Sequence, residues 1–403
     1  MRLCIEKSLP KGNLVAPPSK SAAHRILICA GLSKGESTVK NVALSQDIQA
    51  TLNCLEAIGC KVNVNGDTVK IKGVENFDSI GQKILECNES GSTLRFFIPI
   101  CLLGNGKVTL RGSEKLLSRP LGIYKEICER QNIEMISDAC TVTLCGNLKK
   151  DDFEIQGNIS SQFISGLMFA LPLLKDDSVI KIIPPFESKP YVDMTADTLN
   201  AFGVLTETDD DNVIKISGAQ RYLPQNMTVE GDWSNAAFLY ALKESGAEIT
   251  INGVSRESKQ GDRICVDYFK KLKEGFCTLD VTDCPDLAPI LFAFALKYHG
   301  AKFTGTDRLR LKESDRISCM QEELEKFGAE FTVGKNEVEI AKKDFHMPTE
   351  TIYGHNDHRI VMATAFLLMH TGGELDGYEA VRKSYPDFFD VMKNSGVKIN
   401  YLT

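Results

Sequence analysis

The chain has 403 residues, of which 43% are hydrophobic and 25% are charged, and its formal net charge is −7. This length exceeds what a single hydrophobic core usually serves, so we expect two domains. The acidic balance argues against non-specific binding to nucleic acid. No apolar run approaches the roughly 18 residues of a membrane-spanning helix, so we expect no membrane partner.

The beginning of the chain shows no basic segment leading into an apolar one, so we expect no signal peptide. The thirteen cysteines include no Cys-x-x-Cys pair, and most of them lie within apolar periodic segments. Such usage is typical of reduced, buried thiols rather than of disulfides. The sequence therefore predicts a cytoplasmic protein.

The first predicted element, residues 3–14, has the character of a strand and no helix of its own. We expect it to complete the C-terminal half of the protein, together with the last few residues. Pro17-Pro18 follows, and two adjacent prolines exclude helix and suit a hinge. We expect the chain to cross between two halves here and again near residues 227–231. The predicted domains are residues 1–17 with 229–403, and residues 18–228.

Beyond this hinge the chain repeats one pattern of elements. Its first copy is a helix over 48–58, a glycine, and strands over 61–64 and 68–71. The same shape recurs over 121–146, 192–218, 317–340 and from 388 to the end, and in a shortened form over 264–279.

A second pattern, consisting of a polar start, an apolar helix and a strand, alternates with the first. Its copies open at Ser21, Ser92, Ser161, Ser234, Pro285 and His358. Most of these starts are about 70 residues apart, which indicates an internal repeat. We therefore predict an α/β fold with six copies of a two-helix, roughly four-strand unit, three before residue 228 and three after it.

One junction carries an especially dense polar segment. Residues 302–311 read as a strand and lead into Lys312-Glu313-Ser314-Asp315-Arg316. An amphipathic helix follows, with Ile317, Met320, Leu324 and Phe327 on one stripe, and either Ser314 or Asp315 can cap it. The first turn of a helix carries free N–H groups and a partial positive charge, so an anion would bind there.

Polar or charged residues that packing does not require occur at the equivalent junctions of the other units. They are Lys20, Ser21, Arg25, Glu89, Ser90, Gly91, Ser92, Arg95, Ser118, Arg119, Ser160, Ser161, Gln162, Ser188, Lys189, Tyr191, Asp232, Asp286, Asp357, His358, Arg359 and Lys383. Because equivalent ends of repeated units point the same way, we expect these residues to converge on one surface in each half. The lysines and arginines among these residues form two sets, one from each half, so we expect two anionic groups as ligands.

Taken singly, most of these signals have an ordinary explanation as helix caps or surface charges. Ser90-Gly91-Ser92 resembles a phosphate loop, but neither Walker A nor GxGxxG is present, so nucleotide binding is unsupported. His355 and His358 have a spacing that could hold a metal, yet no Cys or Glu stands at ligand spacing, and we expect none. Asp286 and Glu313 lie beside cations and are the best candidates for acid–base chemistry.

Several longer motifs together suggest a family. They are residues 19–25, 118–120, 160–163, 188–191, 231–232, 285–286, 312–316, 356–359 and 383–387. At these motifs the chain resembles the 5-enolpyruvylshikimate-3-phosphate synthases over essentially its whole length. The resemblance implies two similar globular halves, each with three βαβαββ units. These would form the inside-out α/β barrels of the enolpyruvyl transferases, with an active-site cleft between them.

The resemblance also implies a reaction. The enolpyruvyl group of phosphoenolpyruvate would be transferred to the 5-hydroxyl of shikimate 3-phosphate, with release of phosphate and with neither cofactor nor metal. Asp286 would be the general base, Glu313 would help to protonate the methylene carbon, and Lys20 would assist proton movement. Closure of the halves would assemble the site, and we expect a monomer.

The binding residues carry over to matching positions of this sequence. Those implied for phosphoenolpyruvate are Lys20, Gly91, Arg119, Gln162, Arg316, Arg359 and Lys383. Those implied for shikimate 3-phosphate are Lys20, Ser21, Arg25, Ser160, Ser161, Gln162, Ser188, Tyr191, Asp286 and Lys312. As a helix-start lysine, Lys20 is expected to need no burial.

Two positions depart from the family's pattern. Glu89 stands where the family usually has Asn, and a carboxylate beside two anionic substrates is unfavourable unless a cation neutralises it. We therefore leave Glu89 out of the predicted site. Arg308 stands where many members have Asn, which adds a cation that would compensate.

Two other functions remain open. An enolpyruvyl transferase acting on UDP-N-acetylglucosamine shares the fold, but it would carry a reactive cysteine between Ser113 and Pro120, where this chain has none. A non-catalytic repeat protein that senses anions is the other alternative. The carboxylates of Asp286 and Glu313 argue against it, because they would repel an anion without helping to bind it.

Overall fold

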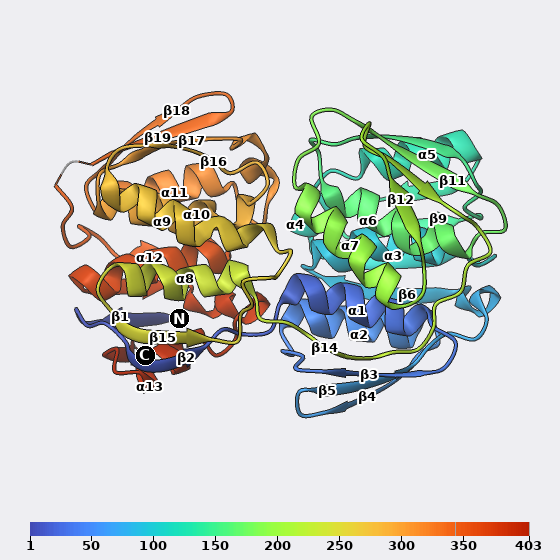
Figure 1. Cartoon of the computed structure of the whole chain (residues 1–403), viewed down its shortest axis with the longest axis horizontal. Coiled ribbons are helices and arrows are strands. Elements are labelled where there is room, and N and C mark those ends of the chain that lie inside the picture. Colours follow the sequence, from blue (N-terminus) through green and yellow to red (C-terminus); the bar gives the residue numbers. More distant parts are fainter. Residues whose placement is uncertain (343, 403) are drawn as a thin grey trace. The chain divides into compact units, whose positions relative to one another are not determined.

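The computed structural model describes residues 1–342 and 344–402, which form two compact units. The split unit comprises Met1–Ser19 and Gly231–Thr403, and the continuous unit comprises Lys20–Glu230. Figure 1 shows both chain ends in the split unit. The two crossing segments lie side by side, because Pro18 forms an isolated antiparallel bridge with Gly231.

The continuous unit contains three four-stranded sheets built to one plan: a parallel pair of strands followed by an antiparallel hairpin. The first sheet has the order β14 (Asn226–Thr228), β3 (Glu36–Lys40), β5 (Thr68–Lys72), β4 (Lys61–Asn65). The second has the order β6 (Lys83–Asn88), β7 (Val108–Gly112), β9 (Thr141–Cys145), β8 (Glu134–Ser137). The third has the order β10 (Asp152–Gln156), β11 (Ser178–Ile183), β13 (Val213–Ile216), β12 (Thr206–Thr208).

In the split unit, strands from both ends of the chain share one sheet. Its order is β20 (Ile352–Tyr353), β21 (Gly373–Asp376), β1 (Arg2–Ile5), β22 (Ile399–Leu402). A second sheet has the order β16 (Thr278–Asp280), β17 (Ala301–Thr304), β19 (Glu337–Lys342), β18 (Ala329–Val333). Parallel strands β15 (Glu248–Asn252) and β2 (Lys11–Val15) form the third, a two-stranded sheet. The N-terminal strand β1 thus lies in the same unit as the C-terminal half of the chain.

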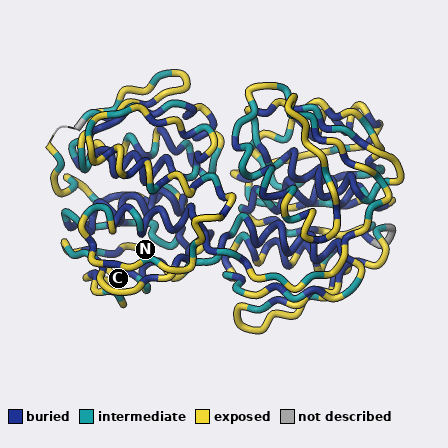
Figure 2. Tube along the Cα trace, viewed as in Figure 1, coloured by how far each residue is buried: buried dark blue, intermediate teal, exposed yellow. Residues whose placement is uncertain are grey.

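In the described residues, three helices of each unit are rich in apolar residues and are buried almost completely. They are α1 (Lys20–Leu32), α3 (Gly91–Cys101) and α6 (Ser161–Ala170) in the continuous unit, and α8 (Trp233–Glu244), α10 (Ala288–Lys297) and α12 (His358–Thr371) in the split unit. A helix without a polar face has to lie inside the fold, and Figure 2 shows dark blue helices within each unit. These helices begin within three residues of the predicted polar starts.

The remaining helices have one apolar stripe. They are α2 (Gln46–Ala57), α4 (Glu114–Leu117), α5 (Gly122–Gln131), α7 (Lys189–Ala201), α9 (Cys265–Glu274), α11 (Arg316–Glu325) and α13 (Phe388–Asn394). In α9 the buried residues are Cys265, Tyr268, Phe269 and Leu272, the spacing expected of one helical face. No helix in the described part of the chain is long and apolar enough to cross a lipid bilayer.

One predicted element is wrong in part. The strand expected over 302–311 ends at Thr304, and a 3-10 helix over Asp307–Leu311 follows. Gly305 adopts φ +75°, a left-handed conformation that ends the strand. The backbone N–H of Asp307 then donates to the side chain of Asn336 at 2.8 Å, which holds the chain in the turn.

Candidate functional site

Helix starts gather on one side of the continuous unit. Arg25, in the second turn of α1, donates from Nε to Thr195 Oγ1 at 2.8 Å and from Nη2 to the backbone oxygen of Tyr191 at 2.8 Å. Both partners lie in the first two turns of α7, and Nη2 also reaches Ser165 of α6 at 3.5 Å. The beginnings of these three helices are therefore neighbours, as the repeat predicted.

Gly91, the first residue of α3, is enclosed by predicted site residues. A Cβ at this position would lie 2.8 Å from Arg119 Nη1, 2.9 Å from Arg95 Nη1 and 3.5 Å from Gln162 Oε1. Arg95 Nη1 donates to Gln162 Oε1 at 3.0 Å, which links the start of α3 to the start of α6. The structure thus brings Gly91, Arg119 and Gln162 together around a position with no side chain.

The predicted serines lie at helix starts in the same unit. Ser160 caps α6, and its Oγ accepts a hydrogen bond from the Gln162 N–H at 3.3 Å. Ser161 is the first residue of α6, and Ser188 is the N-cap residue of α7 with a left-handed backbone at φ 56°. Ser21 is the second residue of α1. Each is placed as a capping or first-turn residue, next to backbone N–H groups that favour anions.

Lys20 is more enclosed than the sequence suggested. Its side chain is 15% exposed, and its Nζ lies 2.9 Å from the Asp47 carboxylate of α2. Lys20 is thus partly buried at the start of α1, where it pairs with a carboxylate of α2. Sequence reasoning also missed Asp47, which bears no motif of its own.

In the split unit, Arg316 at the start of α11 is bound to three carboxylates. Its Nε donates to Asp357 at 2.9 Å, its Nη1 to Asp286 at 2.9 Å and its Nη2 to Glu313 at 2.8 Å. Burial by itself would lower the pKa of Arg316, but these carboxylates raise it well above its usual value. Asp315, rather than Ser314, caps the helix.

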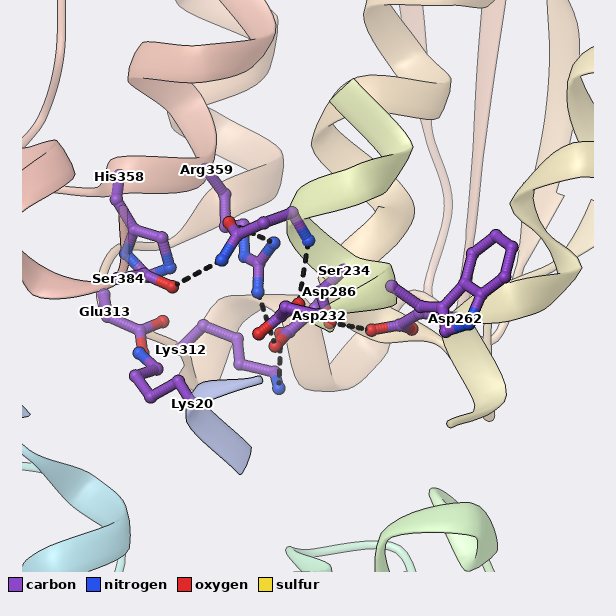
Figure 3. A network of polar contacts seen from close by, with 12 residues as sticks. Lys20, Asp232, Ser234, Asp262, Asp286, Lys312, Glu313, His358, Arg359 and Ser384 are labelled. Atoms are coloured by element: carbon purple, nitrogen blue, oxygen red, sulfur yellow. Dashed lines mark hydrogen bonds and ion pairs between the residues drawn. The ribbon is translucent and has the colours of Figure 1, made fainter. Parts of the chain in front are cut away.

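Asp286 receives cations on both of its oxygens. Lys312 Nζ lies 3.2 Å and Arg316 Nη1 2.9 Å from Oδ1, and Arg359 Nη2 lies 3.5 Å from Oδ2. Figure 3 shows the contacts of Lys312 and Arg359 with this carboxylate. Burial would raise the pKa of Asp286, but Lys312, Arg359 and Arg316 together hold it well below its usual value. Burial lowers the pKa of Lys312, and its attraction to Asp286 only partly offsets this effect.

The two remaining predicted cations of this unit are also buried and hydrogen-bonded. Arg359, the second residue of α12, donates from Nη1 to Asn235 Oδ1 at 3.4 Å. Asn235 in turn donates to Ser384 Oγ at 3.1 Å, next to Lys383. Lys383 Nζ donates to the backbone oxygen of Asn356 at 2.6 Å. The junctions before α8, α11 and α12 and the turn carrying Asp286 therefore meet in one polar cluster.

Asp262 is a member of this cluster that the sequence did not indicate. It is 2% exposed, and Ser234 Oγ donates to its carboxylate. Burial and the charge of Asp286 raise the pKa of Asp262 to about 7. Figure 3 shows Asp262 and Ser234 beside Asp232 and Asp286. Neither Asp262 nor Asn235 has a periodic signal, although Asn235 follows the cap Asp232 within the first turn of α8.

The two departures from the family pattern lie one in each unit. Arg308 is 8% exposed in the 3-10 helix before Lys312, and its charge helps to lower the pKa of Lys312. Glu89 precedes the cap Ser90 of α3 and is partly exposed. Arg308 thus adds positive charge near Lys312 in the split unit.

Each unit by itself is an α/β repeat domain whose helix starts bring buried arginines and lysines together with a few carboxylates. These features define a class of protein that binds small anions and can move protons among them.

Comparisons with known proteins narrow the class. The family model for EPSP synthase (3-phosphoshikimate 1-carboxyvinyltransferase) matches residues 6–278 and 268–392, and the chain belongs to this family. The 3-phosphoshikimate 1-carboxyvinyltransferase of Clostridium perfringens is 37% identical over 417 residues, covering 98% of each chain. That of Clostridium kluyveri is 38% identical over 411 residues, covering 97% of this chain and 96% of the other.

A solved structure agrees with the fold. EPSP synthase from Acinetobacter baumannii superimposes with a TM-score of 0.78 at 21% identity, covering 99% of each chain. The α/β class with two domains is therefore confirmed, and the enzyme class of the family is transferase.

Proposed function

We propose that this chain transfers the enolpyruvyl group of phosphoenolpyruvate to the 5-hydroxyl of shikimate 3-phosphate and releases phosphate. The observation that carries the proposal is the full-length match to the EPSP synthase family and to relatives named for this transferase activity. The product is 5-enolpyruvylshikimate 3-phosphate, in the pathway to chorismate and the aromatic amino acids.

The chemistry is an addition followed by an elimination. Asp286 takes the proton of the 5-hydroxyl, the hydroxyl oxygen bonds to C2 of phosphoenolpyruvate, and C3 gains a proton with the help of Glu313. The tetrahedral intermediate then loses phosphate from C2 and a proton from C3, which restores the double bond. Lys20 assists these proton movements and balances the charge of the departing phosphate.

The predicted binding residues divide between the two substrates, and some of them contact both. We propose that Lys20, Gly91, Arg119, Gln162, Arg316, Arg359 and Lys383 bind phosphoenolpyruvate. We propose that Lys20, Ser21, Arg25, Ser160, Ser161, Gln162, Ser188, Tyr191, Asp286 and Lys312 bind shikimate 3-phosphate. Arginine side chains match carboxylate and phosphate in a forked geometry, which suits both ligands.

The surroundings of Asp286 suggest how its basicity is controlled. Its pKa lies well below its usual value because Lys312, Arg359 and Arg316 surround it. A carboxylate so stabilised is a weak base. The anionic groups of bound substrates would pair with the same cations and raise the pKa of Asp286. Asp286 would then become a better base only when the substrates are present.

Arg316 has to exchange a partner to bind phosphoenolpyruvate. It is 1% exposed and donates to three carboxylates, two of which are Asp286 and Glu313. The substrate carboxylate would replace Glu313, the neighbour on the same helix start. That exchange would release Glu313 for its part in protonating C3.

We further propose that the protein works as a cytoplasmic monomer without a nucleic-acid or membrane partner. The net charge of −7 supports the absence of a nucleic-acid partner. Light scattering of the purified chain, with and without substrates, tests the monomer directly.

One coupled assay tests the reaction. Phosphate release from phosphoenolpyruvate should depend on shikimate 3-phosphate and should be absent without it. Release that depends on UDP-N-acetylglucosamine would replace the proposal by the related transferase activity. Binding of both ligands without release would indicate an anion sensor.

A further inference from the structure

The short loop between β20 and α12 has an unusual backbone. His355 and Asn356 adopt φ values of 48° and 53°, so two successive residues other than glycine are left-handed. Side chains with a Cβ rarely adopt this conformation, and surrounding contacts must hold it in place. The loop leads directly into Asp357, the N-cap residue of α12.

Glu323 of α11 supplies these contacts. Its side chain is fully buried, and its Oε2 accepts a hydrogen bond from the Tyr353 N–H at 2.9 Å. Its Oε1 accepts one from His355 Nε2 at 2.7 Å. The Glu323 carboxylate therefore fixes both the backbone of Tyr353, at the start of the loop, and the side chain of His355 within it.

The same cluster contains Glu322, whose carboxylate lies 4.0 Å from His355 Nε2. Two carboxylates and an imidazole could hold a metal ion. However, Lys326 Nζ already lies 2.9 Å from Glu323 Oε2 and provides positive charge there. The arrangement is that of an ion pair that fixes a loop.

The loop in turn positions two cations of the polar cluster. The backbone oxygen of Asn356 accepts the hydrogen bond of Lys383 Nζ at 2.6 Å. Asp357 accepts from Arg316 Nε at 2.9 Å, and from Ser314 Oγ at 3.0 Å. A shift of the loop would therefore displace the ammonium group of Lys383.

We propose that Glu323 and His355 are positioning residues that hold residues 354–357 so that Lys383 and Arg316 meet phosphoenolpyruvate. This inference rests on the proposed function for the identity of the substrate. Neither residue contacts the proposed reacting groups, and both act through the loop. Loss of the pair weakens the binding of phosphoenolpyruvate more than that of shikimate 3-phosphate, because Lys383 is assigned to the first substrate only.

The charge of His355 supports this role. The groups that face it are Cys319, Glu322 and Glu323 from α11, and the ring of Tyr353 from β20, whose centroid lies 4.9 Å away. Burial would lower the pKa of His355, but hydrogen bonds with Cys319 and Glu323 raise it to about 9. The imidazolium and the Glu323 carboxylate thus form a charged pair at neutral pH.

The test compares His355→Gln with Glu322→Gln, an exposed neighbour that serves as the matched control. His355→Gln should raise the KM for phosphoenolpyruvate about tenfold, with the KM for shikimate 3-phosphate nearly unchanged. Glu322→Gln should behave as the wild type. In the Lys383→Met background, His355→Gln should add less than its full effect in the wild type, because part of that effect acts through Lys383. An unchanged KM for phosphoenolpyruvate, an equal rise in both KM values, or full additivity with Lys383→Met would overturn the proposal.

Hydrogen exchange separates this inference from the reaction itself. Amides of residues 354–357 should exchange faster in His355→Gln than in the wild type or in Glu322→Gln. Unchanged exchange would reject the positioning pair even if the enzyme turns over. A wild type without phosphate release would instead reject the proposed function.

Discussion

Asp286 Oδ1 accepts hydrogen bonds from Arg316 Nη1 at 2.9 Å and from Lys312 Nζ at 3.2 Å, although 26 residues separate Asp286 from Lys312 in the sequence. The negative charge of the proposed base, Asp286, is therefore balanced by two cations of the protein itself.

Asp286→Asn should lower kcat by about 10²–10⁴, the usual contribution of a positioned general base. The amide keeps the shape of the carboxylate but cannot take the 5-hydroxyl proton. Steady-state release of phosphate measures the effect. Asp283→Asn, at an exposed carboxylate in the same turn, is the control and should keep wild-type turnover. A wild-type kcat in Asp286→Asn would remove Asp286 from the mechanism.

The Asp262→Asn variant should gain stability relative to the wild type as pH rises. Burial and Asp286 raise the pKa of Asp262 to about 7, above that of an unfolded aspartate. Below pH 4 the carboxyl of Asp262 is protonated in both states, and its raised pKa costs no stability. Between pH 4 and 7 the carboxyl ionises in the unfolded state but keeps its proton in the folded state, so the free energy of unfolding falls. Above pH 7 this loss is complete. Asparagine does not ionise and avoids this loss. The free energy of unfolding of the variant should therefore increase by a few kcal/mol relative to that of the wild type as pH rises. Thermal melts of both proteins between pH 5 and 8 measure the shift, and a constant difference would contradict it.

Gly91→Ala should raise the KM for phosphoenolpyruvate about tenfold with little effect on stability. The added methyl group would lie 2.8 Å from Arg119 Nη1 and 2.9 Å from Arg95 Nη1, so both guanidinium groups have to move. Long side chains can do so at little cost to the fold, and alanine favours a helix start over glycine. Gly122→Ala is a matched control, because Gly122 also begins a helix and a Cβ added there would meet no atom within 4 Å. Equal kinetics in the two variants would contradict the role of Gly91.

Lys20→Met should abolish measurable turnover and also cost some stability. The substitution leaves Asp47 without its partner at 2.9 Å, which costs about 1–3 kcal/mol for a largely buried charge. Asp47→Asn breaks the same ion pair and should lose a similar amount of stability while it keeps turnover. Melting temperatures and phosphate release of both variants decide the matter. If Asp47→Asn loses turnover as completely as Lys20→Met, the lysine acts through the pair and not on the substrate.

Much of the fold was predictable because it depends on local patterns. The apolar helices expected after the polar starts at Pro285 and His358 are buried as α10 and α12, and the helix and hairpin over 48–71 appear as α2, β4 and β5. Periodicity and turn residues determine such elements within a few neighbouring residues. The strand expected over 302–311 failed because a left-handed glycine at Gly305 outweighed the alternation beyond it.

The motifs of the sequence were sufficient to indicate which residue types gather at the helix starts and that they suit anions. Only the tertiary structure decided how these groups pair: Asp286 with three cations, Lys20 with Asp47, and Glu323 with His355. A contact between side chains from distant segments leaves no periodic trace in the chain. Its strength depends on burial, which the fold alone determines, and the pKa shifts of Asp262 and His355 follow from that burial and those partners.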